Sequence, residues 1–202
     1  MRTRSDVIVV LLASACSGVA AAQSFFYTAQ ERSVHARAGS VSQSTSAPNF
    51  APWVNAIATA ISGRETAASE HTSRLDLGEV YFSGQVRSGP TTSATTNAKG
   101  VFDVTFTLSA ATQVRLNYFM SEWWNLTLWT PSGSQVLSVA NGFAYFDDRM
   151  LSLNAGTYRI RADADVSDGK AGNALVQFQI VPAPTSLAVI GVVSVFAARR
   201  RR

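Results

Sequence analysis

The sequence predicts an all-β chain that folds as an antiparallel β-sandwich. From residue 79 onward, apolar side chains recur at every second position in several runs, which is typical of strands with one buried face. Gly, Pro, Asn and Asp bound these runs in combinations that form tight turns. No segment is long enough and periodic enough to predict a helix with assurance in this part of the chain.

The first half of the chain gives a weaker pattern. Residues 27–38 are predicted to form a strand. Residues 52–61 fit both a helix and a strand, because Trp53, Ile57 and Ile61 recur every four residues within an alternating pattern. The β elements around them and the frequent β-branched residues favour a strand. The polar segments 40–48 and 88–100, rich in Gly, Ser and Thr, are predicted to be loops.

Six later strands are predicted to bury one face of mainly large apolar residues. These residues are Val80, Phe82 and Val86; Phe102, Val104, Phe106 and Leu108; Val114, Leu116 and Tyr118; Trp124, Leu126 and Leu128; Tyr158, Ile160, Ala162 and Ala164; and Val176, Phe178 and Ile180. The turns between strands are predicted at 130–133, 141–142, 154–156 and 168–169. Strands spaced in this way predict two packed antiparallel sheets.

The charge balance excludes a nucleic-acid-binding domain. The net charge of +4 is made up of +1 in residues 1–22 and +4 in residues 185–202, which leaves −1 for residues 23–184. A near-neutral middle has no basic stripe with which to neutralise phosphates.

The N-terminus predicts a secretory signal peptide over residues 1–22. Arg2 and Arg4 precede the apolar run 7–15, and small residues follow before the expected cleavage. An uncleaved anchor and lipidation at Cys16 are the alternatives. The residues that define the cleavage site are Ala20, Ala22 and Gln23.

The C-terminus predicts a short, transient membrane anchor. Pro182, Ala183 and Pro184 are followed by the uncharged stretch 185–198, which as a helix would be about 21 Å long, against about 30 Å of hydrocarbon. The chain then ends on a membrane-stop cluster, which should stay cytoplasmic. This cluster consists of Arg199, Arg200, Arg201 and Arg202.

The order of these elements over 181–202 resembles the PEP-CTERM sorting signal, with Ala183 where the usual motif has Glu. An ordinary tail-anchored helix is the alternative. The resemblance implies an exosortase as processing partner beside signal peptidase, cleavage near the Pro-x-Pro motif and a Gram-negative cell that makes exopolysaccharide or biofilm. The expected route passes through the inner membrane to the cell surface or the extracellular space.

Residues 101–181 resemble a bacterial pre-peptidase C-terminal domain. The similar stretches are 102–108, the strand 126–128 with the turn 130–133, and Leu153-x-Ala-Gly-Thr-Tyr-x-Ile160. This resemblance implies a jelly-roll-like sandwich without catalytic residues. The expected domains are therefore 1–22, 23–180 and 181–202.

No catalytic motif stands out, and the chain is predicted not to be an enzyme. His35 and His71 lie in separate polar segments and are predicted at the surface. A small hydrolase is the least favoured class, because a glycosidase pair needs two carboxylates close together in a cleft, and the glutamates are scattered. They are Glu31, Glu65, Glu70, Glu79 and Glu122.

Two clusters suggest ligands. Asp163, Asp165 and Asp168 resemble calcium-loop spacing, although Ser167 stands where a third alternate acid would be, so a solvated strand end is favoured and no cofactor is predicted. Trp123 and Trp129 would form a sugar-stacking platform if they project outward while Trp124 points inward; ordinary core packing is the favoured alternative. The sequence thus predicts an exported envelope or matrix protein associated with exopolysaccharide, with a carbohydrate-binding module as the second hypothesis.

Overall fold

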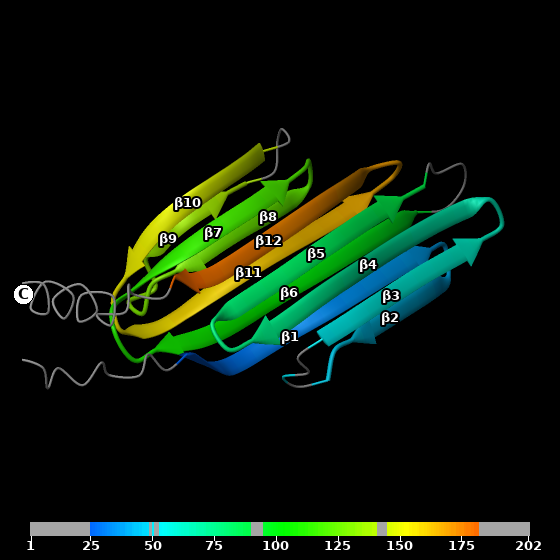
Figure 1. The fold of residues 1–202 in the computed structure, drawn as a ribbon. Helices are drawn as coiled ribbons and strands as arrows, with labels where there is room; N and C mark the ends of the chain where they lie inside the picture. The colour runs from blue at the N-terminus through cyan, green and yellow to red at the C-terminus, as the bar shows by residue number, and fades with distance from the viewer. Residues whose placement is uncertain (1–24, 49, 51–52, 90–94, 141–144, 182–202) are drawn as a thin grey trace, which may run out of the picture.

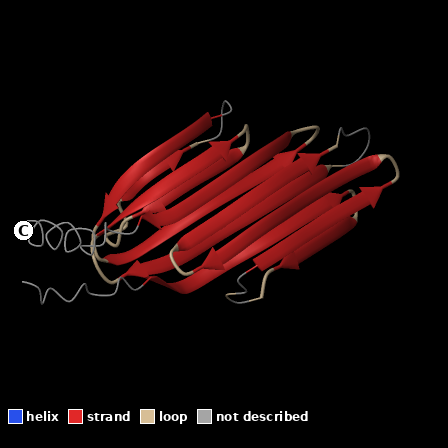
Figure 2. Ribbon diagram, viewed as in Figure 1, coloured by secondary structure: helices blue, strands red, loops and turns tan. Residues whose placement is uncertain are grey.

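The computed structural model describes residues 25–48, 50, 53–89, 95–140 and 145–181. This part of the chain contains twelve strands and no helix (Figure 2). The strands form two six-stranded sheets that lie face to face (Figure 1), with every neighbouring pair antiparallel. The predicted all-β fold with two antiparallel sheets is confirmed.

Sheet A has the strand order β2-β1-β6-β11-β8-β9, and sheet B has the order β10-β7-β12-β5-β4-β3. The strands of sheet A are β2 (Val41–Ser46), β1 (Phe25–Ala38), β6 (Thr96–Leu108), β11 (Gly156–Ser167), β8 (Trp124–Trp129) and β9 (Gln135–Val139). Those of sheet B are β10 (Tyr145–Leu153), β7 (Thr112–Met120), β12 (Ala171–Val181), β5 (Glu79–Ser88), β4 (Glu65–Asp76) and β3 (Trp53–Ser62).

The predicted inner faces are confirmed almost residue for residue. Each apolar residue predicted to face inward is buried, apart from Ile180, which is half-buried at the end of β12. The strands predicted at 27–38 and 52–61 are present as β1 and β3. The turn predicted at 168–169 has positive φ at both residues, as a tight hairpin requires.

Two loop predictions are wrong. Segment 40–48 contains β2, and segment 88–100 contains the first five residues of β6. In both cases polar residues pair with β1 through the backbone. His35 of β1, for example, lies between Ser44 of β2 on one side and Lys99 of β6 on the other. The ladder hydrogen bonds do not depend on side-chain polarity, and an edge strand that is exposed on most of its length leaves no apolar alternation to detect.

The surface position predicted for His71 is also wrong, whereas His35 is half-exposed on β1. The His71 ring lies on the inner face of β4, edge-on to the rings of Phe82 and Phe102 at centroid distances of 5.1 and 5.9 Å. Its Nε2 is 2.8 Å from Ser73 Oγ, which also accepts a hydrogen bond from buried Arg32. The imidazole is therefore buried against two aromatic rings, with its Nε2 beside the Ser73 hydroxyl.

Trp124 is the largest fully buried side chain, and its indole ring lies against glycines of both sheets. A Cβ added at Gly84 of β5 would be 2.7 Å from Trp124 Cη2, and one added at Gly100 of β6 would be 2.9 Å from the same atom. The glycines on these facing strands therefore make room for the indole ring.

The side of the sandwich formed by β2 and β3 is closed by side chains. Thr45 Oγ1 donates a hydrogen bond to the carbonyl of Ile57 (2.9 Å), and Gln43 Oε1 accepts one from the amide of Thr59 (2.6 Å). Edge strand β3 thus has backbone groups already bonded to β2.

The predicted signal peptide, Pro-x-Pro motif, apolar tail, arginine cluster and turn at 141–142 lie outside the described residues. Within the described ranges, no helix has the length and apolar character needed to cross a membrane.

Candidate functional site

The outer face of sheet A carries a band of charged residues that crosses its central strands. In the register of the sheet, Glu31 of β1 lies opposite Asp103 of β6, and Asp103 lies opposite Arg161 of β11. Arg159 and Asp163 lie on the same face of β11, two residues to either side of Arg161. We call these five residues the charged band.

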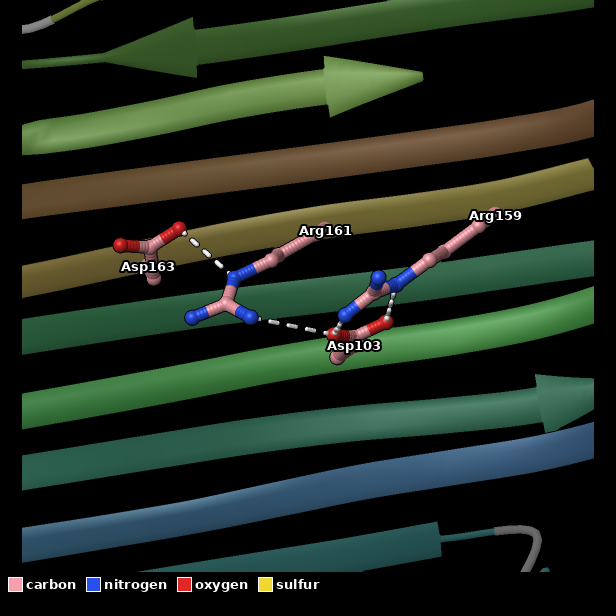
Figure 3. A network of polar contacts seen from close by, with 4 residues as sticks. All are labelled: Asp103, Arg159, Arg161 and Asp163. Carbon is pink, nitrogen blue, oxygen red and sulfur yellow. Dashed lines mark hydrogen bonds and ion pairs between the residues drawn. The ribbon is translucent and has the colours of Figure 1, made fainter. Parts of the chain in front are cut away.

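Asp103 is the centre of the charged band. Its carboxylate accepts hydrogen bonds from Arg159 Nε at 2.8 Å, from the Arg159 Nη2 and from Arg161 Nη1 at 3.4 Å (Figure 3). Although Asp103 points outward, its side chain is only 8% exposed, because the two guanidinium groups cover it. Its hydrogen bond to Arg159, together with the negative charges of Asp103 and Glu31, raises the pKa of Arg159 above its usual value. Arg159 therefore remains charged.

Arg159 is held from a second side by an aromatic ring. Its guanidinium carbon lies 5.3 Å from the centroid of the Trp129 ring, which comes from the neighbouring strand β8. An arginine held by a bidentate carboxylate and by an aromatic face loses little freedom on binding a ligand. Its side chain is nevertheless 48% exposed, so that solvent can reach it.

A shallow depression of about 300 Å³ adjoins Arg159, a volume at the lower end of ligand pockets. A bulge in β1 between Tyr27 and Ala29 shifts the register there, and the small side chain of Ala29 leaves the hollow open. The lining residues are Ala29, Gln30, Glu31, Asp103, Thr105 and Arg159. The site offers carboxylate, hydroxyl and guanidinium groups for hydrogen bonding at the surface.

Of the residues singled out from the sequence, Trp129 and Asp163 lie at this site; Trp123 does not. Trp124 points inward as predicted, whereas Trp123 precedes β8 and Trp129 ends it. Six residues of extended chain span about 20 Å, so the two rings do not form one platform. The Trp123 ring also lies beneath the ammonium group of Lys170, 4.2 Å from its centroid.

The three aspartates considered for calcium do not share a site, and two of them have separate partners. Asp163 Oδ1 accepts a hydrogen bond from Arg161 Nε (3.0 Å), and Asp165 accepts one from Asn97 (2.6 Å). Asp168 lies in the turn that follows β11. Among the described residues, no group of three or more His, Cys, Asp or Glu side chains is placed to hold a metal ion.

The glutamates remain scattered in the structure. Glu65 is buried, Glu79 forms an ion pair with Arg74 (2.7 Å), and Glu70 and Glu122 are exposed. One carboxylate pair that the structure brings together is Glu31 with Asp103, which the sequence did not predict. No local signal pointed to it, because the two residues lie on strands that are distant in sequence.

The comparisons with known proteins place this chain in no family. No family model and no curated protein matches it. It is similar to the enzymatically active domain of tailspike protein 4 of bacteriophage CBA120, with 13% identity and a TM-score of 0.26 over 66% of this chain and 20% of that domain. It is also similar to the GH31 alpha-xylosidase from Xanthomonas citri, with 9% identity and a TM-score of 0.26 over 83% of this chain and 34% of the xylosidase. The chain thus spans about a fifth and a third of these structures, and such scores carry no functional argument.

The position of Asp103 predicts that Asp103→Asn lowers the free energy of unfolding by about 1–2 kcal/mol, because both arginines lose a charged acceptor. Urea denaturation measures the loss. Asp163→Asn is the matched control, since Asp163 is more exposed and is paired with Arg161, and a loss below about 0.5 kcal/mol is expected. Equal losses in the two variants would contradict the central role of Asp103.

Proposed function

We propose that this chain is an exported, non-catalytic sandwich of the cell envelope or extracellular matrix, and that it binds polysaccharide through the charged band. The observation that favours binding is the Arg159 guanidinium, held between Asp103 and Trp129 beside the depression. Planar hydrogen-bonding groups in fixed positions next to an aromatic ring suit the hydroxyls and the apolar faces of sugar rings.

A jelly-roll-like topology is part of this proposal. From β5 to β12 the chain enters the sheets in the order B, A, B, A, A, B, A, B. This gives the four-strand orders β5-β12-β7-β10 and β6-β11-β8-β9, the arrangement of an eight-stranded double-sheet roll. Strands β1 to β4 then extend both sheets on one side. The resemblance of residues 101–181 to a pre-peptidase C-terminal domain agrees with this topology.

The proposal that the chain is not an enzyme rests on the groups that surround the Asp103 carboxylate. A glycosidase needs one carboxyl group as acid and another as nucleophile or base, both facing the bond that breaks. Asp103 is covered by two guanidinium groups, and the depression beside Glu31 is shallow. The pair is therefore better suited to holding arginines than to catalysis.

If the chain binds polysaccharide through the charged band, substitution of Trp129 should weaken binding and substitution of Trp123 should not. We expect Trp129→Ala and Arg159→Ala to weaken binding about tenfold or more, because each removes part of the preorganised surface. Trp123→Ala, at the other end of β8, should leave binding unchanged. Affinity electrophoresis in gels that contain a neutral glucan, a neutral xylan or anionic alginate measures the retardation of each variant. Failure of all three polysaccharides to retard the native chain would refute the binding function.

Export and sorting are proposed from the termini and have their own test. Signal cleavage before Gln23 and processing near Pro182–Pro184 would remove both apolar ends of the chain. Intact-mass spectrometry of the protein from its native host measures both ends directly. A mature chain that retains Arg202 in the cytoplasmic membrane would exclude exosortase processing.

A further inference from the structure

The two lateral edges of sheet B differ in how they end. At β3, side chains of β2 occupy backbone groups of the edge strand. At the opposite edge is β10, which pairs only with β7 among the described strands. β10 is nine residues long and pairs with β7 without a bulge. A long, regular edge strand is a template for a further strand.

The direction of the backbone groups of β10 follows from one hydrogen bond. The amide of Ser121 donates to the carbonyl of Asn173 (2.9 Å), which places the odd-numbered residues of β7 in hydrogen-bonded pairs with β12. By the alternation of an antiparallel ladder, even-numbered residues of β7 bond to β10, where their partners are odd-numbered. The β10 residues whose backbone faces the free edge are therefore Phe146, Asp148, Met150 and Ser152.

The outer face of β10 carries Phe146, Asp148 and Met150, and its inner face carries the charged residues Asp147 and Arg149 among apolar ones. Phe146 and Met150 lie on the outer face and are 64% and 55% exposed. Asp147 and Arg149 lie on the inner face and are joined by an ion pair. The Asp147 carboxylate also accepts a hydrogen bond from the backbone amide of Asp148 (2.8 Å). This amide faces the free edge, and a second strand could take the place of the carboxylate as its acceptor.

We infer that β10 pairs antiparallel with β10 of a second copy of this chain, with Asp148 on the two-fold axis. Backbone hydrogen bonding at this edge requires even-numbered residues to lie opposite even-numbered residues. Centred on Asp148, the pairing places Phe146 opposite Met150 and Asp147 opposite Arg149, each twice. Apolar and opposite-charge cross-strand pairs stabilise a sheet. About six backbone hydrogen bonds then join the two copies.

Neighbouring registers lack this complementarity. Pairing centred on Asp147 would bring two like charges together at that residue, and pairing centred on Arg149 would do the same with two arginines. In the inferred register the one like-charge contact is Asp148 with Asp148. Arg115 binds this carboxylate through Nε at 2.9 Å and through Nη2 at 2.5 Å, which offsets the repulsion. Charges on an edge strand usually discourage pairing, but here the opposite charges of Asp147 and Arg149 make the inner face of the strand complementary to itself.

A contact of one strand per copy is small, so we expect a dissociation constant of about 10–500 µM. Sedimentation velocity of the full chain at about 20 µM to 1 mM should show a reversible dimer. Asp148→Pro should abolish it, because proline removes an edge donor that β7 does not use. Asp148→Asn, which keeps the amide, is the matched control and should still dimerise. A monomer throughout this range, or a dimer that survives Asp148→Pro, overturns the proposal.

Two further experiments test the register itself. In a Cys16→Ser chain, Asp148→Cys should form an intermolecular disulfide on mild oxidation, since its Cα atoms would be about 5.5 Å apart across the axis. Met150→Cys should not, because its Cα atoms would be about 14 Å apart. The charge variants Asp147→Arg and Arg149→Asp should each be monomeric alone and dimerise when mixed. Cross-linking at residue 150 equal to that at residue 148, or no association in the mixture, rejects this pairing.

Discussion

Trp124→Ala is expected to lower the free energy of unfolding by about 4 kcal/mol, the largest effect of any single side chain in this fold. The ring is fully buried between the sheets and is bordered by Phe82, at a centroid distance of 5.3 Å. Truncation removes its apolar contacts and leaves a cavity that glycines cannot fill. Guanidinium denaturation followed by far-UV circular dichroism measures the change in midpoint and slope.

A double-mutant cycle tests the reason for this effect. Gly84→Ala alone should cost about 1–3 kcal/mol, because the new Cβ would lie 2.5 Å from Phe82 Cζ and 2.7 Å from the indole ring. In the Trp124→Ala chain the same substitution should cost about 1 kcal/mol less, since the clash with the indole is gone and Phe82 can move into the space that it leaves. Trp123→Ala is the matched control and should cost under about 1.5 kcal/mol, because Trp123 is only partly buried. Strict additivity of Gly84→Ala and Trp124→Ala would show that the glycine does not exist to admit the ring.

The second large effect expected is a loss of stability in mild acid, caused by His71. Burial, with a further contribution from the charge of Arg32, lowers the pKa of His71 from 6.5 to about 3. Below pH 6.5 the unfolded chain therefore binds a proton that the folded chain does not, so the free energy of unfolding falls as the pH falls. Between pH 7 and pH 5 the expected loss is about 2 kcal/mol.

His71→Gln isolates this contribution, because glutamine does not titrate and can still bond to Ser73. The variant should be nearly insensitive to pH over this range, and His35→Gln, at the half-exposed histidine of β1, should retain the slope of the native chain. Urea denaturation at half-unit pH steps measures all three chains. The carboxylates whose pKa is lowered, those of Glu79, Asp147 and Asp148, destabilise the fold only at lower pH. An unchanged slope in His71→Gln would assign the acid sensitivity elsewhere.

Most strands that could be predicted from the sequence have large apolar inner faces; β3 is an exception, because alanines 56, 58 and 60 face inward while Ile57 and Ile61 are exposed. Strand β4 escaped detection because its inner face consists mainly of small or polar residues, among them Ser69, His71 and Ser73. Strand β10 escaped detection because Phe146 and Met150 are exposed on its outer face while Asp147 and Arg149 lie on its inner face. Both strands are specified by their neighbours in the sheet rather than by their own periodicity.

The candidate site was less predictable than the fold. Trp129 and Asp163 were considered from the sequence for other reasons, whereas Asp103 and Arg159 were expected only as polar residues alternating with buried ones. These two residues are 56 positions apart and meet because β6 and β11 pair in one particular register. Local spacing holds no information on such a register, which depends on every hydrogen bond and packed pair along both strands.

The placement of β12 has a consequence for biosynthesis. This strand comes last among those described, yet it lies in the interior of sheet B, between β7 and β5. Until it has left the ribosome, β7 and β5 each lack a partner on one side, so a nascent chain cannot complete the sheet. A nonsense mutation anywhere before Ala171 would therefore yield an aggregation-prone fragment rather than a shorter working domain.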